Sequence, residues 1–548
     1  MPTSLTPWIP AGAELHMFAP ELALVGTIVA LLLVPLIIGR SSQVAAGVTL
    51  MGALVTLALT WRVAGQVDSG AYAGMAPPGS SPMLLVDNFS VFFKLLLMLF
   101  VATVTWLWML SPGAQRQQDN RRFVTGPGSP EFFVLLLTSA LGMALMVGTL
   151  NLLVMILAIE TASLPSYAIV ASDKRSRPGA EASLKYVLFG AATSSIMIYG
   201  LSLVYGSFGT LDLPTIAATA GQTGFTLAAG FGLFALCVGV AFKISAVPFH
   251  FWCPDVFEGA PIEVTTWLSV ASKAAGLGLL LRIVYALSAP ADGGVWMGPI
   301  SWGIGLVAAL TCTVGNLAAL RQDAVKRILA YSSIAHAGYM MMAAAIFTRG
   351  AELAHLNIGL AAVVAYIFVY LIMNLGAFSV TAMVAWRTGS DHISSFTGLG
   401  RRAPWLALPL AVCLFSLIGL PPLGGFAAKW WLLVALGRAA SAQPWLWALI
   451  VVAVINTAIS LYYYVRIIRQ MYLRDDERQP KVDAPLGGLV MVNLCAVALL
   501  LLGTVLFSPL GNRAERYASN LFGAPSTGPI IASVATQADE PTAVSPER

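Results

Sequence analysis

Apolar stretches of about 20 residues recur along nearly the whole chain, separated by short polar segments. A helix of that length crosses the hydrocarbon core of a bilayer, which is about 30 Å thick. The pattern therefore predicts an all-α polytopic membrane protein with about fourteen transmembrane helices. The expected spans are residues 19–39, 43–64, 88–110, 130–149, 151–171, 185–206, 225–257, 262–288, 296–319, 324–347, 356–386, 404–436, 444–472 and 485–507.

Two of these spans are too long for a straight crossing and carry prolines inside. Segments 225–257 and 404–436 would each run about 50 Å as a helix, and they contain Pro248 and Pro421–Pro422 respectively. Proline removes a backbone donor and clashes with the preceding turn. Interrupted backbone at membrane depth is tolerated only where protein or a watery cavity surrounds it. We therefore predict two broken helices.

The two broken helices are the seventh and the twelfth spans, which lie five spans apart. Matching interruptions in two halves are typical of inverted-repeat transporters, whose sites lie at the breaks. An odd number of spans per unit gives the two units opposite orientations. The predicted divisions are 1–129 (helices 1–3), 130–288 (first five-helix repeat), 289–472 (second five-helix repeat), 473–523 (helix 14) and 524–548 (a small, polar tail expected to be disordered).

Charge in the loops gives an orientation. If the fourteen spans are right, the odd-numbered loops hold nineteen Lys and Arg residues and the even-numbered loops hold four, namely Arg62, Arg282, Arg349 and Arg438. Basic loops stay in the cytoplasm. Both termini are therefore expected on the non-cytoplasmic side.

Composition agrees with a membrane protein and argues against redox chemistry within the chain. Of the 548 residues, 58% are hydrophobic and 10% are charged, whereas soluble domains carry about 25% charged residues. The net charge of +5 does not by itself indicate a function. The five cysteines are scattered and have no spacing suited to zinc or an iron–sulfur cluster. We expect no cofactor and no metal in this chain.

Five charged residues fall inside predicted spans, where a charge costs at least about 2.5–3.5 kcal/mol. Glu160 and Lys273 lie about 14 and 16 Å into their spans, close to the midplane. Lys243 and Lys429 lie in the two interrupted spans. Lys94 lies only about 9 Å deep, from where its side chain can reach the interface.

A buried lysine beside an acid suits proton transfer. Burial disfavours the charged form of lysine, and a nearby carboxylate favours it. Movement of Glu160 relative to Lys243 would thus load or unload a proton. His250 after the first break and His336 in the tenth span are possible proton relays. The alternative is a static buried ion pair that fixes helix packing.

Several motifs together carry a resemblance to a known family. FKISAVPFHFWCPDVFEGAP, LSVASKAAGLG, AVKRILAYSSIAHAGYMM and SLIGLPPLGGFAAKWW resemble the antiporter-like membrane subunits of proton-pumping NADH–quinone oxidoreductase, respiratory complex I. The resemblance covers residues 19 to 508. Within that family the chain is most similar to the subunit N type, because it contains APELALVGTIVALLL, EGAP and a lysine in the second broken helix.

The resemblance implies a fourteen-helix subunit with two inverted five-helix repeats, and a proton channel coupled at a distance to chemistry elsewhere. It implies that Lys243 pumps under control of Glu160, that Lys273 passes the proton along mid-membrane, and that Lys429 hands it to the second half-channel. Flavin, iron–sulfur clusters and quinone reduction would belong to partner subunits of a bacterial inner-membrane complex, in which this chain also contacts lipid.

Two other functions fit a chain of this kind. One is a subunit of a secondary cation/proton antiporter, which would work without NADH dehydrogenase activity. The other is a purely structural spacer of a membrane arm, in which replacement of Lys243 would leave pumping unchanged.

Overall fold

The chain is helical almost throughout. The computed structural model describes residues 12–68, 73–75, 82–111, 129–173, 176–288, 297–347, 353–475 and 480–519. Twelve helices within these ranges are long and apolar enough to cross a membrane, so the prediction of an all-α multi-pass membrane protein is confirmed. The predicted spans 324–347 and 404–436 are not among the twelve, and the count of fourteen stays a prediction.

The N-terminal part consists of three long helices and a small hairpin. Strands β1 and β2 pair antiparallel. The elements are α1 (Gly12–Met17), α2 (Ala19–Ile37), α3 (Ser42–Asp68), β1 (Ala73–Met75), β2 (Leu84–Val86) and α4 (Asn88–Met109).

The next two groups of helices correspond to the two predicted repeats. The first contains α6 (Pro130–Val147), α7 (Leu152–Val170), α8 (Arg177–Phe208), α9 (Leu213–Thr223), α10 (Leu227–Ile244), α11 (Trp252–Gly259) and α12 (Ile262–Ser288). The second contains α13 (Met297–Ala319), α14 (Val325–Met342), η1 (Ala343–Ile346), α15 (Leu353–Thr388), η2 (Ile393–Phe396), α16 (Leu399–Arg402), α17 (Pro404–Ile418), α18 (Gly424–Ala439) and α19 (Leu446–Leu473). Helices α20 (Leu486–Gly503) and α21 (Phe507–Ser519) follow.

The two groups repeat one pattern of neighbours. Helix α6 packs on α7 and on α12, as α13 packs on α14 and on α19. Helix α10 packs between α8 and α12, as α17 packs between α15 and α19. Short backbone bridges join Asn151 to Asp212 and Ala324 to His392, at corresponding places in the two groups. These correspondences agree with a repeat, while the residue boundaries of the predicted units stay untested.

Side-chain caps explain where several of these helices begin. Asp87 accepts a hydrogen bond from the Ser90 backbone at the start of α4, and Asn151 does the same for the first turn of α7. Ser176, Asp212 and Thr226 cap α8, α9 and α10 in turn. Such caps satisfy backbone donors that the first turn of a helix leaves free.

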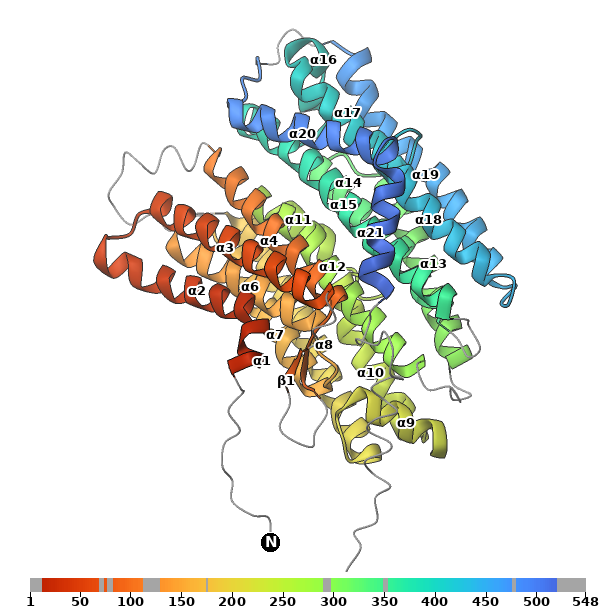
Figure 1. Cartoon of the computed structure of the whole chain (residues 1–548). Helices are drawn as coiled ribbons and strands as arrows, with labels where there is room; N and C mark the ends of the chain where they lie inside the picture. The colour runs from red at the N-terminus through yellow and green to blue at the C-terminus, as the bar shows by residue number, and fades with distance from the viewer. Residues whose placement is uncertain are drawn as a thin grey trace, which may run out of the picture.

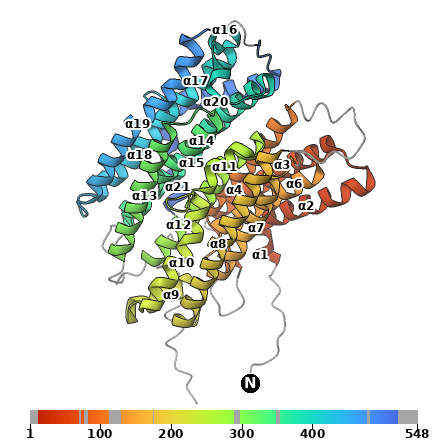
Figure 2. The same cartoon turned by 180° about the vertical axis from the view of Figure 1, so that it is seen from behind.

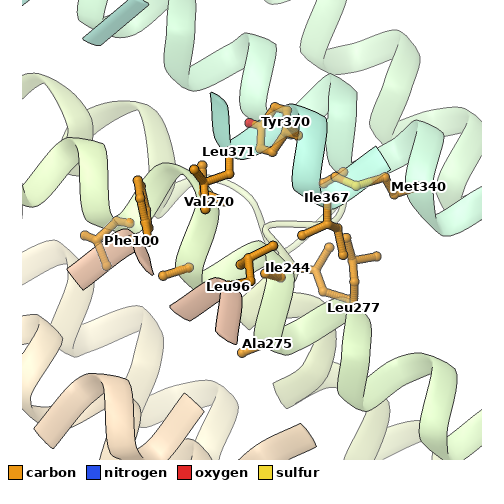
Figure 3. Packing of buried hydrophobic residues seen from close by; sticks show 14 of the residues in the cluster. Leu96, Phe100, Ile244, Val270, Ala275, Leu277, Met340, Ile367, Tyr370 and Leu371 are labelled. Atoms are coloured by element: carbon orange, nitrogen blue, oxygen red, sulfur yellow. The ribbon is translucent and has the colours of Figure 1, made fainter. Parts of the chain in front are cut away.

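Helix α12 lies at the centre of the molecule. In its apolar stretch 94% of the residues are buried, against 17% in α2 at the periphery. The red-to-yellow helices lie on one side and the cyan-to-blue helices on the other, with α12 between them in both views (Figures 1 and 2). Val270, Ala275 and Leu277 of α12 pack with buried residues of α4, α10, α14 and α15 (Figure 3). Charges carried by α12 are therefore far from lipid.

Two expectations about charged residues were wrong. Lys94 does not reach the interface: its side chain is 5% exposed, and its Nζ lies 2.5 Å from Glu21 Oε1. Arg282 is not a loop residue: it lies in α12, is fully buried and pairs with Asp87. Both basic side chains have an acid from a distant part of the chain beside them, which the span pattern did not reveal.

Three elements were not expected from the sequence: the β1–β2 hairpin, α9 and the C-terminal α21. The predicted disordered tail, 524–548, lies outside the described residues.

Candidate functional site in the membrane interior

The first predicted break separates α10 from α11. Ser245, directly after α10, has a φ of 66°, a left-handed conformation that ends the helix. Side chains from two other helices form hydrogen bonds with backbone groups at the break. The Trp252 indole donates to the Phe242 carbonyl at 3.1 Å, and Thr311 Oγ1 accepts from the Val247 backbone at 3.0 Å. The interruption is therefore held in place by α11 and α13.

Lys243 lies in the last turn of α10 and is completely buried. Its Nζ donates to Ser163 Oγ of α7 at 3.0 Å. The carboxyl end of a helix carries a partial negative charge that favours a cation. The break thus gives the ammonium a favourable field in the protein interior.

Glu160 lies on α7, three residues before Ser163, and so on the same side of that helix. Ser194 of α8 donates a hydrogen bond to its carboxylate. Glu160 and Lys273 are the charged neighbours of Lys243. Among the described residues, however, no ion pair joins Glu160 to Lys243, Lys273 or Lys429. These four residues therefore do not form, in this structure, the static ion pair that was considered as an alternative.

Lys273 is buried in the middle of α12 and contacts the second half of the broken helix. Its Nζ lies 5.1 Å from the centre of the Trp252 ring and 4.9 Å from that of Phe257. Nζ also lies 3.5 Å from Cys253 Sγ, which in turn lies 3.8 Å from Ser333 Oγ of α14. Cys253 thus connects Lys273 with the second group of helices.

The second predicted break separates α17 from α18. Gly419 has a φ of 90°, and the carbonyls of Leu417 and Ile418 before it are left without helical donors. Lys429 Nζ, from α18, donates to both, at 3.2 and 2.8 Å. Lys429 therefore lies at the carboxyl end of the first half-helix, as Lys243 does at the first break.

A small cavity adjoins Lys429. Its volume is about 130 Å³, and its lining includes Tyr339, Gly419, Trp430 and Thr457. The Lys429 ammonium lies 4.7 Å from the centre of the Tyr339 ring. A site of this size holds several waters where polar groups are present.

His336 and His250 occupy different surroundings. His336 is buried on α14, and its Nδ1 lies 2.9 Å from the Tyr366 hydroxyl of α15. Lys429 is a charged neighbour of His336. His250 lies in the first break, where its Nδ1 is buried without a hydrogen-bond partner among the described residues. The structure thus connects His336, but not His250, to one of the lysines.

The sequence-predicted residues are distributed along the centre of the molecule, from Glu160 and Lys243 through Lys273 to His336 and Lys429. Sequence reasoning missed three polar residues between them: Ser163, Cys253 and Tyr366. Ser163 had a recognisable signal, since it follows Glu160 at helical spacing. Cys253 had none, because its contacts join segments far apart in the chain.

A family model described as NADH:quinone oxidoreductase/Mrp antiporter, transmembrane, matches residues 149–460. That range runs from just before α7 into α19. It includes all six residues predicted from the sequence: Glu160, Lys243, His250, Lys273, His336 and Lys429. A curated relative, NADH-quinone oxidoreductase subunit N 2 of Sorangium cellulosum, is 40% identical over 527 residues, which cover 93% of this chain and 98% of the relative.

Solved structures agree in fold. A chain of respiratory complex I from Thermus thermophilus with bound aureothin has a TM-score of 0.70 and 32% identity, and the match covers 90% of this chain and 99% of that one. A chain of the Mrp complex from Dietzia sp. has a TM-score of 0.77 but 20% identity, covering 96% and 99%. The second likeness concerns the fold alone.

Proposed function

This chain belongs to the NADH:quinone oxidoreductase/Mrp antiporter family of membrane subunits, and we propose that it is the subunit N type of a proton-translocating NADH–quinone oxidoreductase. In this function it moves protons across the membrane while NADH oxidation and quinone reduction take place in other subunits. The observation that carries the proposal is the placement of Lys243 and Lys429 at the two helix breaks, each at a carboxyl end.

The proposed route begins at Lys243. A proton held on its ammonium is stabilised by Ser163 and by the nearby charge of Glu160. If Glu160 moves away, the buried ammonium loses that stabilisation and releases its proton, because burial disfavours the charged form. Lys273 receives it next, and its own charge repels a proton returning to Lys243.

From Lys273 the route passes to the second group of helices. Cys253 of α11 lies between Lys273 of α12 and Ser333 of α14. His336 lies one turn farther along α14, with the Tyr366 hydroxyl of α15 beside its ring. His336 neighbours Lys429, which adjoins the small cavity described above. Lys429 then hands the proton to the second half-channel. A relay role for His250, which lies in the first break, stays a prediction.

A subunit of a secondary antiporter is the less favoured function. The curated relative is named as an oxidoreductase subunit and is 40% identical, whereas the Mrp chain is 20% identical. An antiporter would work without NADH dehydrogenase activity and would depend on sodium or potassium.

We also propose where the chain and its redox partners lie. We place the chain in a bacterial inner membrane, as its curated relatives suggest, and the loop charges favour an orientation with both termini on the non-cytoplasmic side. Flavin and iron–sulfur clusters would lie in partner subunits, since the cysteines of this chain are dispersed: Cys237, Cys253, Cys312, Cys413 and Cys495 are all free.

The test uses the intact purified assembly in proteoliposomes, with proton uptake and NADH oxidation measured together. Lys243→Ala, Glu160→Ala and Lys429→Ala are each expected to lower the number of protons moved per NADH. An unchanged number of protons per NADH in all three variants would contradict the proposed route. Proton transport that requires sodium and ignores NADH would instead identify an antiporter.

A further inference from the structure

A large apolar groove adjoins α4, α15 and α21. Its volume is about 670 Å³, and it is formed by α3, α4, α15, α20 and α21. Phe92, Leu96 and Leu99 of α4 form one wall, and Val364, Phe368 and Ile372 of α15 form the facing wall. The groove therefore lies where the N-terminal helices meet the C-terminal ones.

Helix α21 lines this groove along most of its length, from Pro509 to Tyr517. It follows the membrane-spanning α20, and in Figure 1 it is the dark blue helix beside α15. Its sequence, FSPLGNRAERYAS, is amphipathic, with Leu510, Ala514 and Tyr517 directed into the groove. Helices of this kind lie at the boundary between acyl chains and head groups. One wall of the groove is thus an amphipathic helix that carries charge next to its apolar side chains.

Among the described residues, one charged side chain lines the groove, Arg513. Arg513 of α21 is exposed and makes no ion pair with any residue that the structure describes. Trp61, 61% exposed, lines the same groove from the end of α3. Tryptophan is enriched at the membrane–water interface. The groove thus combines a cationic, aromatic rim with a deep apolar interior.

We propose that this groove binds a phospholipid with an anionic head group. Its acyl chains lie between α4 and α15, and its phosphate is held by Arg513. The lipid would fill the junction between the N-terminal helices and the second repeat. This inference goes beyond the proposed function and does not depend on proton transport.

The size of the groove argues for lipid rather than for a helix of a neighbouring subunit. A membrane-spanning helix is 10–12 Å across and about 30 Å long, which corresponds to about 2,800 Å³. The groove holds about 670 Å³, within the 300–1,000 Å³ typical of small-molecule sites. Acyl chains are flexible and can follow the shape of such a slot, and the charge of Arg513 favours a lipid whose head group is anionic.

Native mass spectrometry of the full chain in mild detergent tests the proposal, with phosphatidylglycerol and phosphatidylcholine added in equal amounts. The wild-type chain is expected to retain phosphatidylglycerol preferentially. Arg513→Gln should reduce that retention about fivefold, since one arginine near a head group contributes about 1 kcal/mol. The matched control is Arg438→Gln, an exposed arginine at the end of α18 that lies outside the groove.

A second variant tests the apolar part. Ala498 of α20 lines the groove, and Ala498→Phe should fill it and abolish retention of both lipids. Equal retention of phosphatidylglycerol by wild type, Arg513→Gln and Ala498→Phe would overturn the proposal. Equal retention of the two lipids by the wild-type chain would overturn the assignment of Arg513. An intact assembly in which a partner helix crosslinks to Leu99 and no lipid is retained would show that protein fills the groove.

Discussion

Arg282 of α12 holds Asp87, the residue that caps α4, through two parallel hydrogen bonds. Nη1 donates to Oδ2 at 2.9 Å and Nη2 donates to Oδ1 at 2.8 Å. The side chains are 0% and 1% exposed, and Arg282 Nε donates to the Val147 carbonyl at the end of α6. One arginine therefore joins the central helix to the N-terminal helices and to the first repeat.

Removal of one partner of this pair is expected to destabilise the chain strongly. Asp87→Ala leaves a buried guanidinium uncompensated, which costs about 3–5 kcal/mol. Thermal unfolding of the full chain in detergent measures the loss. The double variant Asp87→Leu/Arg282→Met removes both charges and is expected to recover much of that stability. A double variant as unstable as Asp87→Ala would show that the charges themselves are not the cause.

Ser163→Ala is expected to slow proton translocation. Ser163 accepts the hydrogen bond that Lys243 donates, and hydrogen bonds to charged groups contribute about 1.5–3 kcal/mol. Weaker stabilisation of the ammonium should lower NADH-driven proton uptake about tenfold or more in proteoliposomes. Ser166→Ala is the control: it is also buried on α7, but its hydroxyl contacts Ser139 and the Ala162 carbonyl. Equal uptake by both variants would remove Ser163 from the route.

The thiol of Cys253 is expected to matter for transfer between the two groups of helices. It lies between Lys273 and Ser333, so Cys253→Ala should lower proton uptake per NADH, whereas Cys253→Ser should retain most of it. Cys413→Ala, which changes another buried cysteine, serves as the control. Loss of uptake in the serine variant as large as in the alanine variant would indicate a packing role instead.

Tyr366→Phe is expected to impair the second half of the route. The change removes the hydroxyl 2.9 Å from His336 Nδ1 while keeping the ring. Without that partner the Leu417 backbone alone orients the imidazole, and proton uptake should fall several-fold, with a changed dependence on pH. Tyr186→Phe is a suitable comparison, because the buried Tyr186 hydroxyl has no hydrogen-bond partner among the described residues. Identical pH profiles for Tyr366→Phe and wild type would contradict a relay at His336.

Lys94 shows the limit of reasoning from depth alone. Six residues of helix from Asn88 place it within reach of the interface, yet the side chain is buried against Glu21. Glu21 belongs to α2, and its proximity follows from how α2, α3 and α4 pack. Arg282 was misplaced for the same reason, since its partner Asp87 precedes it by 195 residues.

By itself the sequence determined the membrane-spanning class, the two interrupted helices and the charges within the spans at Glu160, Lys243, Lys273 and Lys429. Those features follow from the length of apolar runs, from proline and from the cost of charge in hydrocarbon, all of which are local. Tertiary structure alone decided which groups touch those charges: Ser163 rather than Glu160 at Lys243, Cys253 at Lys273, and two freed carbonyls at Lys429. The reason is that hydrogen bonds act over about 3 Å, and only the packing of helices from distant parts of the chain brings such atoms that close.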